Sequence, residues 1–567
     1  MKEIRSDVLI IGSGGAGVRA AIAANEKGAD VLVVAKTFEG KAHTVMAEGG
    51  INAALCSRDP DDSWESHFRD TVEEGVFLNN QVMAEILARE VIDRVHDLEH
   101  YGFVFDRTES DKIAQRPFGG QSHPRTCHQG DTTGHELIMT LVDEARRRRI
   151  RYMPEISITA LLPAKDDSGK IAGAFGIDIK TGEYLVFCAK AVILATGGSG
   201  RVFKVTSNPH DSTGDGYAMA LRMGAVLQDM EQTQFHPTGM VHPDTARGML
   251  VTEAIRGEGG HLLNSEGKRF MSDYNPEQME LSPRDQTARA NYLEIQAGRT
   301  SPHGGVFLDI RHKGKDYIME RLPRMVHQFE QFAGVDILTQ PMEVAPTAHH
   351  FMGGVRVDPR SCESTEISGL FACGECAGGV HGANRLGGNA LAETQVFGKR
   401  AGDAAGDYAA TARLQPYQQA FVEDEVARIE GPLGSSGVSP SEIKHEMQDI
   451  MWAHAGIVRD EGLLKSGLSM IEALCEKEMR VEGTRRYNLQ WHEYMDVKNM
   501  LLVCRTVLLS AIERRESRGA HFRSDHPRRN DEAGLVNYLC RMDGDRILTD
   551  SSPVEITALE PVKRRGD

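Results

Sequence analysis

The first forty residues show the apolar pattern of a strand, a helix and a second strand. An apolar run at 8–11 predicts a buried strand, and the glycine-rich turn after it leads into an alanine-rich helix at 18–27. Gly28 stands where a helix would end, and a second apolar run follows at 31–34. The pattern therefore predicts a βαβ unit over residues 7–36.

The rest of the chain divides by its apolar pattern and composition. We predict helices at 81–101 and 135–149, short antiparallel strands at 150–190, a buried strand at 191–196 and a further strand at 369–374. Between about 240 and 344 the composition shifts toward Arg, Pro and Met, with shorter apolar runs, which indicates an inserted domain. Residues 411–535 are helical in pattern, and a short tail module follows.

Composition and charge exclude several classes of protein. The chain has 567 residues, of which 40% are apolar and 26% charged, and its net charge of −17 argues against binding nucleic acid. No apolar run approaches the ~18–20 residues of a membrane span, and the first strand begins too early to leave room for a signal peptide. The nine cysteines are scattered, which is typical of a reducing compartment. We therefore expect a cytoplasmic protein.

A dinucleotide fingerprint lies in the turn of the βαβ unit. Gly12, Gly14 and Gly17 have the required spacing: they allow a tight turn, a close approach of the backbone to a pyrophosphate, and close packing of helix on strand. The acid that grips the ribose of NAD is missing at the end of the second strand, where Lys36 stands, and no second complete fingerprint follows a strand. The residues thus predict one bound dinucleotide, with FAD favoured over NAD.

A series of motifs in a fixed order carries a family resemblance over most of the chain. They are KAHTVMAEGGI at 41–51, RPFGGQ at 116–121, ATGG at 195–198, TGDG at 213–216, QFHPT at 234–238, TEAIRGEGG at 252–260, PRD at 283–285, PTAHHFMGG at 346–354, GEC at 374–376, HGANRLG at 381–387 and ESRGAHFR at 516–523. With these motifs the chain resembles the flavoprotein subunit of succinate dehydrogenase or fumarate reductase, in the L-aspartate oxidase superfamily.

The resemblance implies an α/β fold in which a Rossmann-like FAD-binding domain is interrupted by an α+β capping domain. A C-terminal helical domain and a small tail domain complete the expected fold. The expected boundaries are 1–238 and 345–410 for the two segments of the FAD-binding domain, 239–344 for the capping domain, 411–535 for the helical domain and 536–567 for the tail.

The resemblance also implies how FAD is held. His43 matches the histidine that is bonded covalently to the flavin 8α-methyl group, a histidine that L-aspartate oxidase lacks. The other positions that match cofactor contacts are Gly12, Gly14, Gly15, Ala16, Gly17, Lys36, Thr44, Gly49, Gly50, Asp215, Glu375, Ala390 and Leu391. Many relatives carry Ser where Ala390 stands, so the hydroxyl contact of those relatives is not expected here.

A four-carbon dicarboxylate is the implied substrate. His236, Thr252, His349 and Arg385 match the positions that hold its two carboxylates, which need charge-assisted donors. Arg284 matches the proton donor and acceptor, with Glu253 and Arg256 as a relay to solvent. The implied reaction is the interconversion of succinate and fumarate by hydride transfer at flavin N5.

The implied partner is an iron–sulfur subunit, because the chain carries no cluster motif of its own. A membrane anchor with a quinone, or a thiol-oxidising subunit, would complete the electron path, with this chain peripheral on the cytoplasmic face of the membrane. We expect no catalytic metal, because the adjacent side chains of His349 and His350 should diverge on a strand.

Two alternatives stay open at this point. One is a soluble enzyme similar to L-aspartate oxidase, which uses fumarate or oxygen as acceptor; the segment 121–129 has some of that character. The other is a flavin-bearing assembly subunit without activity, against which the full set of dicarboxylate and relay residues argues.

His43 carries the first testable prediction. After acid precipitation, yellow flavin fluorescence should stay with the polypeptide of the natural protein and be released from the variant His43→Ser. The variant His100→Ser, in the predicted helix 81–101, should retain its flavin like the natural protein. Release of all flavin from the natural protein would contradict the covalent link.

Overall fold

A seven-stranded sheet forms the centre of the molecule. The computed structural model describes residues 1–562, and its central sheet has the order β6-β2-β1-β9-β8-β7, with β16 also paired to β9. The bounds of these strands are β1 Lys2–Ile11, β2 Val31–Ala35, β6 Arg151–Pro154, β7 Ile156–Ala164, β8 Asp167–Asp178, β9 Tyr184–Leu194 and β16 Leu370–Ala372. Strands β1 and β2 are parallel and joined by α1 (Gly15–Glu26), so the predicted βαβ unit is confirmed.

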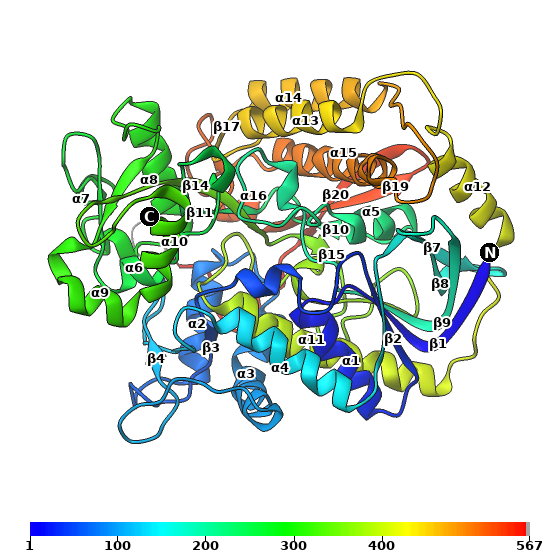
Figure 1. Cartoon of the computed structure of the whole chain (residues 1–567), viewed down its shortest axis with the longest axis horizontal. Coiled ribbons are helices and arrows are strands. Elements are labelled where there is room, and N and C mark those ends of the chain that lie inside the picture. The colour runs from blue at the N-terminus through cyan, green and yellow to red at the C-terminus, as the bar shows by residue number, and fades with distance from the viewer. Residues whose placement is uncertain (563–567) are drawn as a thin grey trace.

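Two separate segments of the chain build this layer. Strand β16 lies parallel to β9, and the helix after it, α11 (Asn389–Thr411), packs along α1 beneath the sheet (Figure 1). The other helices of this part are α2 Trp64–Glu74, α3 Gln81–Tyr101, α4 Thr133–Arg147 and α5 Asp215–Arg222. Helices α3 and α4 confirm the helices predicted at 81–101 and 135–149.

Strand β9 differs from the prediction of separate strands at 150–190 and 191–196. It is one continuous strand that is parallel to β1 from Leu185 to Leu194 and antiparallel to β8 over its first half. Strand β9 pairs with β1 along nearly its whole length and with β8 over its first half. The antiparallel strands and the Rossmann-like strands therefore share one sheet.

The inserted part has its own sheet and its own hydrophobic core. Its sheet has the order β11-β14-β13-β12, and buried apolar residues from Met240 to Val344 form a cluster separate from the main core. Its elements are β11 Thr233–Met240, α6 Ala254–Gly257, β12 His261–Leu263, α7 Met271–Tyr274, α8 Arg284–Gln296, β13 Val306–Asp309, α9 Lys315–Arg321, α10 Pro323–Ala333 and β14 Met342–Phe351. Figure 1 shows this part in green at one end of the molecule.

Helices cover the side of the molecule opposite α1. They are α12 Gln419–Glu430, α13 Pro440–His454, α14 Glu461–Cys475 and α15 Leu489–Glu513 (Figure 1). The tail forms a hairpin of β19 (Val536–Asp543) and β20 (Arg546–Pro553), which joins β10 (Leu227–Gln228) and β15 (Gly354–Val355) in one sheet. Among residues 1–562, every helix is too short or too polar to cross a bilayer.

A buried arginine connects the helical part to the rest of the protein. Arg514, at the C-terminal end of α15, donates from Nε to Glu231 at 2.6 Å and from Nη1 to Glu516 at 3.1 Å. It also donates to the carbonyl oxygens of Gly534 and Val536, which precede and open the tail hairpin. Since Arg514 is fully buried, its loss would leave buried carboxylates without their cation.

We therefore predict that Arg514→Gln lowers the melting temperature by about 2.5–4 °C, because removing one partner of a buried ion pair costs about 3–5 kcal/mol and a chain of 567 residues loses a little under 1 °C for each kcal/mol. Thermal unfolding followed by circular dichroism measures this change. Arg515→Gln is the matched control, because Arg515 is the exposed neighbour. Equal melting temperatures for the two variants would show that Arg514 does not hold these parts together.

Candidate active site

One continuous cavity borders nearly all of the predicted site residues. They are Gly12, Gly14, Gly15, Ala16, Lys36, His43, Thr44, Gly49, Gly50, Asp215, His236, Thr252, Glu253, Arg284, His349, Glu375, Arg385, Ala390 and Leu391. Gly17 and Arg256 lie behind it. The cavity therefore joins the expected dinucleotide site to the expected dicarboxylate site.

The glycine turn has the geometry of a pyrophosphate cradle. Gly12 has a φ of +112°, and a Cβ there would lie 2.2 Å from the carbonyl oxygen of Ala195. A Cβ on Gly17 would lie 2.1 Å from the carbonyl oxygen of Gly12, so Gly17 serves close packing. Gly14 has no side chain to cap the N-terminus of α1, and Thr44 Oγ1 accepts a hydrogen bond from the N–H of Gly15 at 2.9 Å, so the other N–H groups of the first turn are left for an anion. The turn fits the phosphates of FAD.

Lys36 lies in a partly buried ion-pair group that borders the cavity. Its ammonium nitrogen lies 2.6 Å from Asp215 Oδ2 and 2.5 Å from Asp496 Oδ1. Burial alone would lower the pKa of Lys36, but the two carboxylates outweigh it and raise the pKa, so the group stays charged. Asp496, on α15, was missed by the sequence reasoning because it matches no motif and lies far along the chain.

His43 lies where the dinucleotide part of the cavity meets the dicarboxylate part. It begins a short 3-10 helix, His43–Met46, and its ring lies 6.3 Å from the ring of His349, centre to centre. Burial and the charge of Arg385 lower the pKa of His43 to about 4, which keeps the ring neutral. Its Nδ1 is buried without a hydrogen-bond partner among the described residues.

Two further histidines come from neighbouring strands. His236 lies on β11 and His349 on β14, with ring centres 5.3 Å apart. Nδ1 of His236 lies 3.0 Å from the carbonyl oxygen of Thr238, and Nδ1 of His349 lies 2.8 Å from the hydroxyl of Ser207. Burial and nearby arginines lower the pKa of both rings well below the usual value. With each Nδ1 engaged, Nε2 is the atom left for a ligand.

A β-bulge changes what the adjacent histidines can do. Gln234 pairs with His350 and Phe235 pairs with Ala348, so His349 is the extra residue on β14. On a regular strand consecutive side chains would point to opposite faces. Here both rings border the same cavity, although His349 lies near His236 and His350 lies near His381. The two rings have different partners, as expected for diverging side chains. They nevertheless border the same cavity, which the expectation did not include.

Arg284 lies between a carboxylate and an amide. Its Nε donates to Glu253 Oε2 at 2.8 Å, and its Nη1 donates to Gln234 Oε1 at 3.2 Å. Burial opposes ionisation of Glu253, but Arg284 and Arg256 prevail and lower its pKa to about 2. Glu253 therefore carries a charge throughout the physiological pH range. Arg256 continues the series, with Nη2 3.7 Å from Glu253 Oε1.

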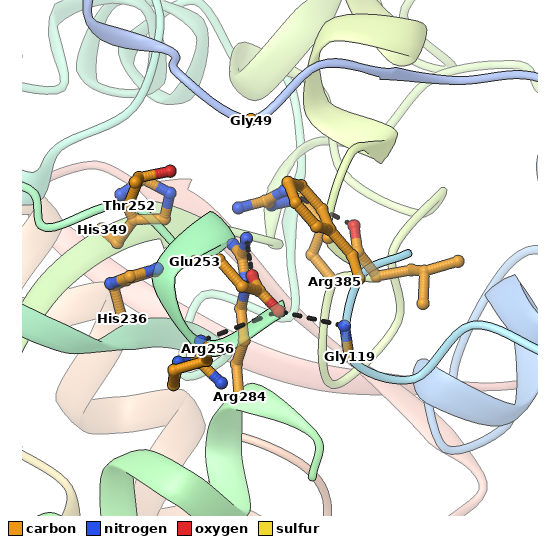
Figure 2. A network of polar contacts seen from close by, with 12 residues as sticks. Gly49, Gly119, His236, Thr252, Glu253, Arg256, Arg284, His349 and Arg385 are labelled. Atoms are coloured by element: carbon orange, nitrogen blue, oxygen red, sulfur yellow. Dashed lines mark hydrogen bonds and ion pairs between the residues drawn. The ribbon is translucent and has the colours of Figure 1, made fainter. Parts of the chain in front are cut away.

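Arg385 faces the histidines across the cavity. Figure 2 shows it on one side, His236, His349 and Thr252 on the other, and Glu253 with Arg284 between them. Its Nη2 donates to Gln234 Oε1 at 3.0 Å, and its Nε is buried without a partner in the described part of the chain. Burial and the charge of Arg284 lower its pKa to about 9, which still leaves it protonated at neutral pH.

The charges around this end of the cavity do not balance. Arg256, Arg284 and Arg385 are buried, and Glu253 is the carboxylate paired with Arg284 and Arg256. Glu280 acts on Arg256, and Glu375 and Glu393 act on Arg385, from farther away. The guanidinium groups therefore outnumber the carboxylate that pairs with them directly. A buried excess of this kind calls for a dianion, and bidentate guanidinium groups suit carboxylates.

Comparison with known proteins identifies the family. The model for an FAD binding domain matches residues 7–391, and the model for the fumarate reductase flavoprotein C-terminal region matches residues 444–566. The chain is 49% identical over 524 residues to a subunit of the fumarate reductase (CoM/CoB) of Methanothermobacter marburgensis, covering 92% of this chain and 94% of that protein. The chain belongs to the fumarate reductase/succinate dehydrogenase flavoprotein family.

Solved structures of relatives show the same fold. Sdh1 of Mycobacterium smegmatis in complex with UQ1 superposes with a TM-score of 0.88 at 45% identity, covering 99% of this chain and 96% of that one. Quinol fumarate reductase FrdA of E. coli superposes with a TM-score of 0.93 at 36% identity, covering 100% of this chain and 99% of that one. The chain is thus an FAD flavoprotein and an oxidoreductase, and the predicted fold class is confirmed.

The sequence analysis did not single out one residue that connects two arginines of the cavity. Gln234 accepts hydrogen bonds from both Arg284 and Arg385 and so fixes the distance between them. Its own amide donates to Asn384 at 2.8 Å. The signal was present, because Gln234 opens the motif that contains His236.

We predict that Arg385→Lys weakens binding of the dianion malonate about thirtyfold or more, because a lysine cannot replace a buried, bidentate guanidinium. Titration of the flavin absorbance with malonate measures the dissociation constant. The control is Arg400→Lys. Arg400 lies on α11 and pairs with Glu90 of α3, so this variant should bind malonate normally. Unchanged malonate affinity in Arg385→Lys would exclude Arg385 from the anion site.

Proposed function

We propose that this chain is the catalytic flavoprotein subunit of an enzyme that interconverts succinate and fumarate. FAD linked to His43 would supply a hydride donor or acceptor at its N5 atom. Arg284 would supply or take the proton, and an iron–sulfur subunit would receive or deliver the electrons.

The continuity of the cavity is the observation that carries this proposal. The glycine cradle, His43 and the excess of positive charge border a single cavity, and the rings of His43 and His349 are 6.3 Å apart. A flavin anchored at His43 would therefore lie against a bound dianion. This proximity is what hydride transfer between the two requires.

The state of His43 favours a covalent link. An imidazole attacks as a nucleophile only when it is neutral, and the pKa of about 4 keeps His43 neutral at physiological pH. Among the described residues, no group forms a hydrogen bond with its Nδ1. Glu375 accepts a hydrogen bond from the backbone N–H of Phe351 at 2.9 Å. Because it borders the same cavity, it would contact another part of FAD.

The dicarboxylate would be held at both ends. Ser207 can donate its hydroxyl proton to Nδ1 of His349, which leaves Nε2–H of His349 to donate to one carboxylate. Arg385 would hold a carboxylate with the Nε that has no partner within residues 1–562. Strong donors around a carboxylate stabilise negative charge that develops on the substrate during hydride transfer.

Arg284 would exchange the proton with the substrate. A free arginine hardly ever loses its proton, but the acceptor here is a carbon next to a carboxylate, which is strongly basic after hydride transfer. Glu253, which is charged at rest, joins Arg284 to Arg256, and Arg256 donates in turn to the carbonyl oxygen of Glu280 at 2.7 Å. Glu253 would take a proton from Arg256 transiently and pass it to the deprotonated Arg284, and Arg256 would regain its proton from outside the cavity.

The names of two relatives suggest which subunits would exchange electrons with this chain. The fumarate reductase of M. marburgensis is named for CoM and CoB, which are thiols, and the M. smegmatis Sdh1 structure contains UQ1, a quinone. We propose an iron–sulfur subunit for this chain, joined to a thiol-oxidising subunit or to a membrane anchor with a quinone. The flavoprotein would lie on the cytoplasmic side.

A dye-coupled assay tests the proposed reaction. Purified protein should reduce an electron-accepting dye with succinate, and a reduced dye should be oxidised with fumarate. Aspartate should give neither signal. Oxidation of aspartate without activity toward succinate would instead indicate an enzyme similar to L-aspartate oxidase.

We predict that Arg284→Lys lowers the turnover number about 10²- to 10⁴-fold, the usual contribution of a positioned acid or base, while FAD stays bound. Steady-state kinetics and the flavin spectrum measure the two quantities. Arg289→Lys, on the same helix α8 but outside the cavity, is the control. Turnover of Arg284→Lys within tenfold of the natural protein would exclude this role.

A further inference from the structure

A second group of buried polar side chains borders the cavity beside the dicarboxylate end. His381 Nε2 lies 2.9 Å from Glu393 Oε2, and both side chains are 2% exposed. The ring of His350 lies 5.3 Å from the ring of His381, in an edge-to-face arrangement. On its other side, His350 Nδ1 lies 3.7 Å from Glu375 Oε2. These residues form a series from Glu393 through His381 and His350 to Glu375.

One ring nitrogen of His350 lacks a hydrogen bond. Its Nε2 is buried and has no hydrogen-bond partner among residues 1–562, and the residue borders the cavity. A buried polar atom without a partner is costly, so native proteins rarely leave one. The proposed function places FAD in this cavity, so the flavin would lie beside the wall that His350 helps to form.

The charges around His350 decide its state. Burial disfavours its protonation, and so do Arg385, His381, His43 and Arg284; together they lower its pKa well below the usual value. Glu375 faces His350 from the 3-10 helix Gly374–Cys376, and Glu393 lies behind His381 on α11. The ring is therefore neutral in the empty site. Burial raises the pKa of Glu375 to about 7, so Glu393, behind His381, is the carboxylate that would stabilise the charged form of His350.

Reduction of a flavin changes this balance. Two electrons and one proton leave the ring system with a net negative charge. A negative charge about 4 Å away in a protein interior raises the pKa of an imidazole by about three pH units. A second proton can then be held next to the reduced flavin.

We propose that His350 is the residue that holds this second proton, neutral opposite the oxidised flavin and protonated opposite the reduced flavin. The His381–Glu393 pair supports the charged form from behind. The balance is two electrons and two protons, of which one proton goes to the flavin and one to His350. The inference rests on the proposed function only in placing FAD in this cavity.

The dependence of the flavin midpoint potential on pH tests this proposal. Spectroelectrochemical titration of the full-length protein with FAD bound, without substrate, gives the potential from acidic to mildly alkaline pH. Each proton taken up with two electrons contributes about 30 mV per pH unit. The natural protein should show about 60 mV per pH unit on the acidic side, where His350 is protonated only opposite the reduced flavin, and about 30 mV per pH unit at higher pH. His350→Gln keeps a hydrogen-bond donor near the Nε2 position but cannot be charged, so its slope should be about 30 mV per pH unit.

A second variant and a control make the result decisive. Glu393→Gln keeps the shape of the side chain and removes its charge, so the change to the smaller slope should occur at lower pH than in the natural protein. His303→Gln changes another histidine that is paired to a glutamate, His303 with Glu343 at 2.9 Å, and should leave the slope unaltered. The FAD content of each variant is measured, and if His350→Gln loses FAD, Glu393→Gln decides.

Three outcomes would overturn the proposal. They are equal slopes in His350→Gln and the natural protein, no effect of Glu393→Gln on the pH of the change, or a stoichiometric metal ion in the holoprotein that His381→Gln removes. Because no substrate is present, these results are independent of the dye-coupled assay. If the natural protein fails to act on succinate and fumarate but the slopes differ as expected, the proposed reaction fails and the role of His350 stands.

Discussion

A group of buried guanidinium groups is the constraint around which the site is organised. Arg256 and Arg284 share the carboxylate of Glu253, and burial together with the charge of Arg284 lowers the pKa of Arg385 to about 9 without neutralising it. Charge that is not fully compensated in a protein interior is costly. A bound dianion would reduce that cost, so these charges would both bind the proposed dicarboxylate and hold it out of water beside the proposed flavin position.

The topology brings these groups together from distant parts of the chain. Strands β11 and β14 pair with each other and run from the FAD-binding part into the sheet of the inserted part, and they carry His236 and His349. Arg284 opens α8 of the inserted part, whereas Arg385 precedes α11 of the main part. The cavity is therefore lined by both parts, and Gln234 accepts a hydrogen bond from one arginine of each.

The sequence predicts what depends on local spacing and on motifs. The glycine turn, the βαβ unit and helices α3 and α4 follow from short-range patterns, and the motif residues border one cavity as the resemblance implies. Features that depend on long-range pairing were not predictable in the same way. Asp496 reaches Lys36 from the helical part, and the continuity of β9 depends on its partner β1, which lies more than 150 residues earlier.

The β-bulge at His349 shows how one irregular residue can connect two kinds of chemistry. It lets His349 border the dicarboxylate end of the cavity while His350 borders the same cavity beside Glu375 and His381. Burial and, after it, the charge of Arg385 lower the pKa of both rings and of His43. A dianion bound to Arg385 would offset part of that positive field, so binding of the proposed substrate would favour protonation of the histidines. The charge of that substrate and the protons near the proposed flavin would then be linked through a single guanidinium group.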